Sequence, residues 1–195
     1  MKFRPLGLAG AALVELQRHE DERGWFARLH CEHEQEAAGI PGRFVQSNLS
    51  FNRRAGTVRG LHFQWPPSRE GKLVRCIRGG IYDAIVDLRP ESDTFTRHVG
   101  VELRVDSPYS LYVPPGFGHG FQTLADDTEV LYLMGDYYEP DLSTGLRYDE
   151  PAFGIQWPTA PTAMSPRDAA APAFDRAQFT AEYTARAAGG PAGRS

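Results

Sequence analysis

The sequence has few cysteines, no long apolar run and no excess of positive charge. Its 195 residues include two cysteines, Cys31 and Cys76, which are too few for a disulfide framework or a paired-thiol zinc site. The clearest apolar stretch, residues 6–14, is far shorter than the roughly 20 residues that cross a bilayer. The formal net charge is −4, whereas non-specific nucleic-acid binding needs a basic surface. We therefore expect a cytoplasmic protein that binds neither nucleic acid nor a membrane.

Glycine and proline, by contrast, are plentiful, with 20 and 15 residues spread along the chain. Turn residues at this frequency favour many short strands over long helices. Residues 72–78 and 81–88 are strand-like, and the Gly79-Gly80 pair between them predicts a hairpin turn. In the second segment, one face carries Tyr82, Ala84, Val86 and Leu88, and the other carries Ile81, Asp83, Ile85 and Asp87. Other strand-like segments are residues 44–51, 98–105, 109–113 and 128–134. The pattern predicts an all-β sandwich or barrel, with helices only near residues 32–38 and 174–187.

Four groups of polar residues lie where a barrel core would have apolar ones. The first contains Arg59, His62 and Gln64, with Lys72 at the start of the next strand. His62 and Gln64 are two residues apart and share a strand face, whereas Arg59 joins that face only if Gly60 kinks the strand. The other three groups are His119 between two glycines, Tyr132 inside an apolar strand, and Asp168 after the last strand.

Each of these residues has a plain structural explanation when it is taken alone. A single strand histidine such as His62 is more often structural, and Lys72 suits a strand edge. Tyr132 is typical of a core aromatic with its hydroxyl at the rim. Asp168 fits a helix N-terminus, because helix-favouring residues follow it. The case for a functional site depends on their occurrence together.

A metal site is an alternative for the same region. His62, Glu70 and Pro114-Pro-Gly-Phe-Gly-His119 match the layout that cupin-type barrels use to hold a metal, but Gln64 stands where a second histidine would be. Two histidines, an amide and a carboxylate could bind iron or manganese weakly. The alternative function is therefore that of a metal-dependent cupin.

The motifs above belong to a longer series that runs in order along residues 1–175. The most specific pair is Arg59-Gly-Leu-His62 followed by Lys72-Leu-Val-Arg75. The others are residues 21–26, 44–48, 87–89, 115–121, 137–140, 155–158 and 165–168. In this series the chain resembles the dTDP-4-dehydrorhamnose 3,5-epimerase family, the deoxysugar-nucleotide branch of the cupins.

This resemblance implies an architecture and an assembly. The expected fold is an antiparallel double-stranded β-helix, the cupin-type jelly roll, with a few short helices. It forms a single domain over residues 1–175, and residues 176–195 add a short helix and a disordered tail. The resemblance also implies a homodimer that uses no metal or other cofactor.

The resemblance further implies a reaction and the residues that perform it. The family abstracts a proton beside the C4 ketone of a nucleotide-linked 4-keto-6-deoxyhexose, here dTDP-4-dehydro-6-deoxyglucose, and returns a proton to the opposite face at C3, C5 or both. The step belongs to deoxysugar biosynthesis of the dTDP-rhamnose type. By resemblance, His62 is the base, Tyr132 the acid, Lys72 the cation beside the enolate oxygen, and Asp168 the carboxylate that orients His62. The implied substrate-binding residues are Arg23, Phe26, Gln46, Asn48, Arg59, His119 and Tyr138, with Asp83 orienting His119.

The roles agree with the chemistry of the side chains. A neutral histidine, with an ordinary pKa near ~6.5, is a suitable base at physiological pH. A cation next to a developing enolate oxygen lowers the barrier.

Three positions depart from the family pattern. Arg28 and Ser143 stand where many 3,5-epimerases carry glutamate, and Leu133 stands where lysine is common. These departures bear on specificity, so a mono-epimerase or ketoisomerase acting on another nucleotide sugar is an alternative. A catalytically silent sugar-nucleotide-binding module is another.

Overall fold

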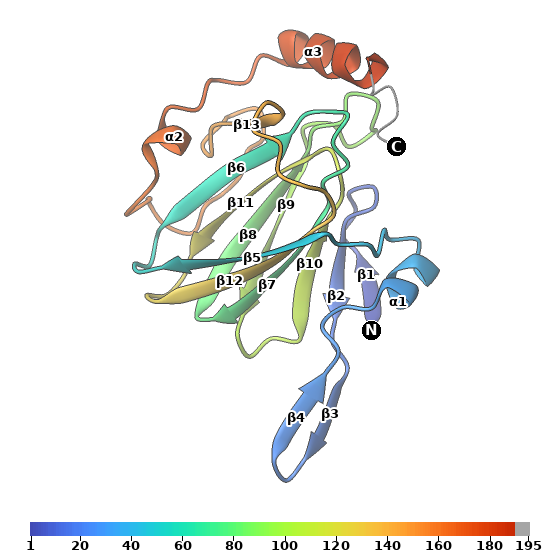
Figure 1. The fold of residues 1–195 in the computed structure, drawn as a ribbon. Helices are drawn as coiled ribbons and strands as arrows, with labels where there is room; N and C mark the ends of the chain where they lie inside the picture. Colours follow the sequence, from blue (N-terminus) through green and yellow to red (C-terminus); the bar gives the residue numbers. More distant parts are fainter. Residues whose placement is uncertain (190–195) are drawn as a thin grey trace.

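Two antiparallel sheets face each other and form the body of the protein (Figure 1). The computed structural model describes residues 1–189. In the six-stranded sheet the order is β1 (Lys2–Pro5), β2 (Ala12–Glu15), β10 (Tyr109–Val113), β7 (Lys72–Arg78), β12 (Thr128–Met134) and β5 (Gln46–Asn52). In the five-stranded sheet it is β13 (Ser143–Gly145), β6 (Val58–Gln64), β11 (Phe117–Thr123), β8 (Gly80–Asp87) and β9 (His98–Arg104). The predicted all-β, antiparallel jelly roll is confirmed.

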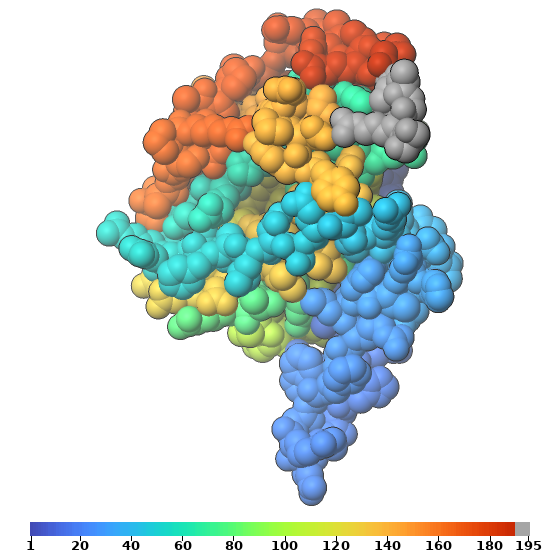
Figure 2. All heavy atoms as spheres, viewed as in Figure 1, coloured from blue at the N-terminus to red at the C-terminus, as the bar shows by residue number. Residues whose placement is uncertain are grey.

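Two smaller features lie outside the sheets. β3 (Arg18–Asp21) and β4 (Gly24–Ala27) pair as a hairpin, here called the arm, which extends away from the body (Figures 1 and 2). The helices are α1 (Glu32–Ala37), α2 (Pro166–Ala169) and α3 (Arg176–Ala188). α1 and α3 agree with the two predicted helices. α2 lies close to the helix start suggested at Asp168, but its N-cap is Ser165 and Asp168 lies within the helix. The predicted disordered tail lies largely outside the described residues. No helix within residues 1–189 is long and apolar enough to cross a membrane.

The alternation of β8 explains how the core is divided. Ile81 and Ile85 point between the two sheets, where they meet Val74 of β7 and Val130 of β12. Ala84 and the other residues of the opposite face pack on the outside of the five-stranded sheet, against a cluster that includes Phe179 of α3. Period-2 alternation sends successive side chains to opposite faces, so one strand supplies two cores.

The predicted hairpin of residues 72–78 and 81–88 is wrong. β7 pairs with β10 and β12, whereas β8 pairs with β9 and β11, so consecutive strands lie in different sheets. Gly79, with a φ of +76°, turns the chain from one sheet to the other. A glycine with positive φ between two strands suits a hairpin turn and a change of sheet equally well. Only the hydrogen-bond partners of the two strands distinguish these two arrangements.

A bulge in β6 brings the polar residues of that strand together. Arg59 lies opposite Phe121 of β11 and His62 lies opposite His119, so β6 uses one residue more than its partner between these pairs. Gly60 makes the bulge possible, because its φ is +111° and a Cβ there would lie 2.6 Å from the Cα of Gly120. The kink at Gly60, on which a shared face for Arg59 and His62 depends, is present.

We expect Gly60→Ala to destabilise the protein strongly. Backbone strain at positive φ and the clash with β11 together predict a loss of roughly 3 kcal/mol or more in the free energy of unfolding. Gly24→Ala is the matched control, because Gly24 also has a positive φ, of +126°, but has nothing near its missing Cβ. It should lose only about 1 kcal/mol. Urea unfolding measures both variants, and equal losses would contradict a close-approach constraint at Gly60.

Candidate active site

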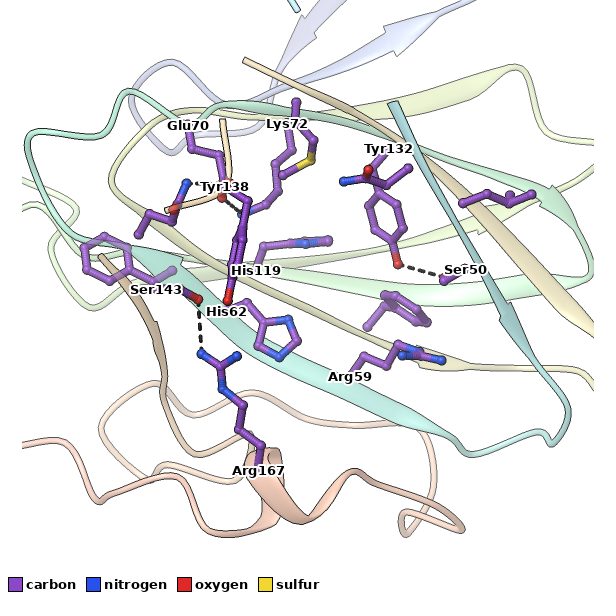
Figure 3. Close-up of a pocket in the computed structure, with 16 residues that line it drawn as sticks. Ser50, Arg59, His62, Glu70, Lys72, His119, Tyr132, Tyr138, Ser143 and Arg167 are labelled. Atoms are coloured by element: carbon purple, nitrogen blue, oxygen red, sulfur yellow. Dashed lines mark hydrogen bonds and ion pairs between the residues drawn. The ribbon is translucent and has the colours of Figure 1, made fainter. Parts of the chain in front are cut away.

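A pocket of about 370 Å³ opens between the two sheets and takes side chains from both (Figure 3). β5, β7 and β12 of the six-stranded sheet line one side, and β6 and β11 of the five-stranded sheet line the other. Segments that follow β12 close the mouth. The polar lining residues are Asn48, Ser50, Arg59, His62, Gln64, Glu70, Lys72, His119, Tyr132, Tyr138, Ser143 and Arg167.

His62 and Asp168 form a hydrogen-bonded pair across 106 residues of sequence. Nε2 of His62 lies 2.8 Å from Oδ1 of Asp168, and the second carboxylate oxygen accepts from the backbone N–H of Gly60 at 3.3 Å. α2 holds the carboxylate in place, since the hydroxyl of Ser165 caps this helix by accepting from the Asp168 N–H. The His62 ring is 46% exposed toward the pocket, whereas Asp168 is buried.

The electrostatics of Asp168 keep it ionised. Burial alone would raise the pKa of its carboxyl, but the hydrogen bonds from His62 and from the Gly60 N–H outweigh burial and lower the pKa below its ordinary value. An ionised carboxylate only accepts hydrogen bonds, so Nε2 of His62 must donate. The other ring nitrogen, Nδ1, is then free to accept a proton.

A second histidine–aspartate pair lies beside the first. His119 is the register partner of His62, and its Nε2 lies 2.6 Å from Oδ1 of Asp83 on β8. Both residues are buried, and within residues 1–189 the other carboxylate oxygen of Asp83 has no hydrogen-bond partner. This hydrogen bond supports the prediction that Asp83 orients His119.

Lys72 and Glu70 form a buried ion pair at the pocket, with Nζ 2.5 Å from Oε1. The other oxygen of Glu70 accepts from the side-chain amide of Gln64 at 2.8 Å. Gln64 also accepts from the Glu139 N–H, so its amide is occupied on both sides. The suggested ligand set for iron or manganese does not assemble. Within residues 1–189, no three histidine, cysteine, aspartate or glutamate side chains are placed to share a metal.

Tyr132 reaches the pocket from the opposite sheet to His62 (Figure 3). Its hydroxyl lies 3.0 Å from the hydroxyl of Ser50 on the neighbouring strand β5, and its ring meets His119 edge-on, with 6.3 Å between ring centroids. Burial raises the pKa of the phenol well above its ordinary value, so Tyr132 stays protonated at neutral pH.

Arg59 lines the same pocket on the strand that carries His62. Its Nε donates to the side-chain oxygen of Asn52 at 2.6 Å. Asn52 is a neutral partner, so the contact positions the guanidinium without cancelling its charge.

Three predicted binding residues lie elsewhere. Gln46 accepts a hydrogen bond from the backbone N–H of Tyr138 at 2.9 Å and does not line the pocket, so it supports the segment that carries Tyr138. Arg23 and Phe26 lie on the arm, away from this pocket, and the Arg23 guanidinium bonds to Asp21. Asn48, Arg59, His119 and Tyr138 all line the pocket.

Two polar lining residues were not singled out from the sequence, namely Ser50 and Arg167. Ser50 is two residues from Asn48 on the same strand face, so alternation was a usable signal. Arg167 lies directly before Asp168, but an exposed arginine in a loop-rich segment carries no distinguishing signal.

Comparison with known proteins identifies the family of this chain. The sequence profile of the dTDP-4-dehydrorhamnose 3,5-epimerase family matches residues 5–176. The chain belongs to the dTDP-4-dehydrorhamnose 3,5-epimerase family. A family member from Sinorhizobium fredii is 38% identical over 184 residues, which cover 94% of each chain.

Two further members of the epimerase family are also informative. A dTDP-4-dehydrorhamnose 3-epimerase from Streptomyces niveus is 38% identical over 169 residues, which cover 86% of this chain and 81% of the relative. The crystal structure of the Bacillus anthracis 3,5-epimerase with TDP and pyrophosphate bound superimposes with a TM-score of 0.86 and 38% identity, covering 89% of this chain and 99% of that one.

The carboxyl of Asp168 should give the stability of this epimerase-family protein a pH dependence. Its folded pKa lies below the ordinary 3.8, so ionised Asp168 stabilises the fold above that pH, and the contribution is lost as pH falls through the folded pKa. We expect Asp168→Asn to lower the free energy of unfolding by about 2 kcal/mol at neutral pH. Urea unfolding should show this difference constant down to about pH 5 and shrinking below about pH 4. A difference that persists unchanged in acid would contradict the assignment.

Proposed function

We propose that this protein epimerises C3, C5 or both of a dTDP-linked 4-keto-6-deoxyhexose, by proton transfer through an enolate. One observation carries the proposal: His62 and Tyr132 approach one pocket from opposite sheets. Inversion of a carbon needs a base on one face and an acid on the other, and these two side chains can supply both.

His62 acts as the base through Nδ1. The hydrogen bond from Nε2 to Asp168 fixes the ring and the tautomer, and the neighbouring carboxylate stabilises the imidazolium that forms. Proton removal beside the C4 ketone leaves negative charge on the ketone oxygen. Lys72 supplies a positive charge at that point, and Glu70 holds its ammonium in place.

Tyr132 returns a proton to the other face. Its raised pKa keeps the phenol protonated until the carbanion is available, and Ser50 holds the hydroxyl in position. His62 alone can remove a proton and return it to the same face, which exchanges hydrogen without changing configuration. Tyr132 therefore determines whether removal of the proton leads to inversion of configuration at the carbon or only to hydrogen exchange.

Variants of these two residues separate the two steps. In D₂O, His62→Ala should slow hydrogen exchange into dTDP-4-keto-6-deoxyglucose at least ~10²-fold, because a positioned base is lost. Tyr132→Phe keeps the ring and should still exchange, while epimer formation falls much further. NMR of the C3 and C5 protons measures both rates and assigns the carbon. Equal losses of exchange and inversion in Tyr132→Phe would assign the second acid to another group.

We also propose that the protein is a homodimer in which the arm serves the partner's pocket. The side chain of Arg23 is 84% exposed and Phe26 is 71% exposed, on a hairpin that extends away from its own body (Figure 2). The outer face of the six-stranded sheet carries the exposed apolar residues Leu49, Phe51 and Ile77. A second copy packed on this face would cover them and bring each arm toward the other pocket. A bidentate guanidinium at Arg23 suits phosphate oxygens.

Arg23→Ala should raise KM more than it lowers kcat. Mixed dimers test the arm directly. In a heterodimer of Arg23→Ala with His62→Ala, one site carries both defects and the other carries neither. Mixing the two variants through an unfolding–refolding cycle should restore about a quarter of wild-type activity at low substrate, as an isologous dimer predicts. Heterodimers that form without recovery would show that the arm does not act across the dimer.

A further inference from the structure

Strand alternation gives the arm two different faces. Trp25 and Phe26 are neighbours in β4, so their side chains point to opposite faces of the hairpin. The register places Glu20 opposite Trp25, and Arg18, two residues before Glu20, shares that face. His19 lies opposite Phe26 on the other face. Which face a second subunit meets therefore depends on how the arm is held at its base.

Arg18 connects the Trp25 face to the body of its own subunit. Its Nη2 donates to the backbone carbonyl of Asp106, in the loop between β9 and β10, at 2.6 Å. Its guanidinium carbon lies 4.5 Å from the centroid of the Trp25 ring, which is a cation–π contact. Among the salt bridges within residues 1–189, none involves Arg18. One side chain thus joins an aromatic ring of the arm to a loop of the body.

The loop that receives Arg18 is itself held in place. The buried guanidinium of Arg75, on β7, donates to the carbonyl of Ser107 at 3.1 Å. The backbone N–H of Leu16 donates to the carbonyl of Pro108 at 2.8 Å. The contact of Arg18 with this loop therefore ties the arm to the six-stranded sheet.

A second basic residue, Arg28, holds the other side of the arm. Its Nη1 donates to Oε1 of Glu34 on α1 at 2.7 Å, and Figure 1 shows α1 close to the point where the arm leaves the body. Hydrogen bonds from the amino group of Met1 and from Arg28 lower the pKa of the Glu34 carboxyl. Phe26, Arg28 and Glu34 line one small cavity of about 110 Å³. The departure from the family pattern at position 28 thus has a partner in this chain, because a glutamate there would repel Glu34.

We propose that Arg18 and Arg28 are positioning residues for substrate recognition. Together they set the direction of the arm, and so the place at which Arg23 and Phe26 meet the partner's pocket. Neither of the two basic residues lines the main pocket of its own subunit, so each acts through the arm. The inference rests on the proposed function, because it takes the arm to serve a second subunit.

Steady-state kinetics of single variants tests the inference. Arg18→Ala should raise KM for the dTDP-linked 4-keto sugar about fivefold, because the cation–π contact and the hydrogen bond to the body are lost. Arg28→Ala should raise KM about two- to threefold, as fits an exposed ion pair. At saturating substrate, kcat should stay within about twofold of the wild type, because the proton-transfer residues are untouched. If Arg18→Ala does not fold, Trp25→Leu removes the ring under the guanidinium and should raise KM about threefold.

A matched control and a combined variant separate positioning from direct contact. Arg147 forms an exposed ion pair with Asp149, outside the arm and the main pocket, and Arg147→Ala should leave KM unchanged. In a protein that already carries Arg23→Ala and Phe26→Ala, the arm has no recognition residues left to place. Adding Arg18→Ala to that protein should raise KM no further.

Hydrogen–deuterium exchange measures the arm directly. Residues 18–27 should take up deuterium faster in Arg18→Ala and in Arg28→Ala than in the wild type, whereas β7 and β8 should not change. This measurement needs no substrate, so it tests the anchoring of the arm whether or not the protein is active.

Three results would count against these conclusions. Unchanged KM in Arg18→Ala, Trp25→Leu and Arg28→Ala, with an active wild type, would overturn the inference and leave the proposed function standing. KM increases that multiply with those of the combined arm variant would overturn it too, because Arg18 would then contact substrate itself. A wild type that exchanges no substrate protons would refute the proposed function, and unchanged deuterium uptake in the arm of the variants would refute the anchoring as well.

Discussion

The close approach of β6 to β11 at Gly60 is the constraint on which the rest of the site depends. The missing Cβ of Gly60 lets the two backbones touch, and the bulge rotates Arg59 to the face that carries His62. The same glycine donates its N–H to Asp168, so the carboxylate that orients His62 is anchored on the bulge as well. One backbone contact thus sets the positions of a guanidinium, an imidazole and a carboxylate.

Around this contact, buried charges occur in pairs. Each of the acids Asp168, Asp83 and Glu70 faces a basic side chain at 2.5–2.8 Å. Pairing keeps ionised groups inside a β-core that would otherwise penalise them. Pairing also determines which atom can face a substrate, because a histidine whose Nε2 is hydrogen-bonded presents only Nδ1. Arg59 in the same pocket has a neutral partner, Asn52, and within residues 1–189 it forms no salt bridge.

The pocket and the arm are proposed to have different functions. Proton transfer, as proposed, takes place inside one subunit, where strands of the two sheets carry His62 and Tyr132. Substrate recognition, as proposed, also draws on the exposed arm of a second subunit. A family that includes a 3-epimerase and 3,5-epimerases at similar identity to this chain is consistent with a fixed catalytic centre and a variable rim.

What the sequence determined by itself was mostly local. Alternation in residues 81–88 predicted which side chains share a face. The structure places Ile81 and Ile85 between the sheets and Ala84, Val86 and Leu88 outside the five-stranded sheet. The sequence also identified Gly60 as the residue whose conformation would decide whether Arg59 shares a face with His62, and the structure gives it a positive φ. The tertiary structure alone decided that Gly79 joins two sheets, that Gln46 supports Tyr138, and that Arg167 enters the pocket. The physical reason is that side-chain direction follows from the period of the backbone, whereas strand partners and contacts across a hundred residues depend on the path of the whole chain.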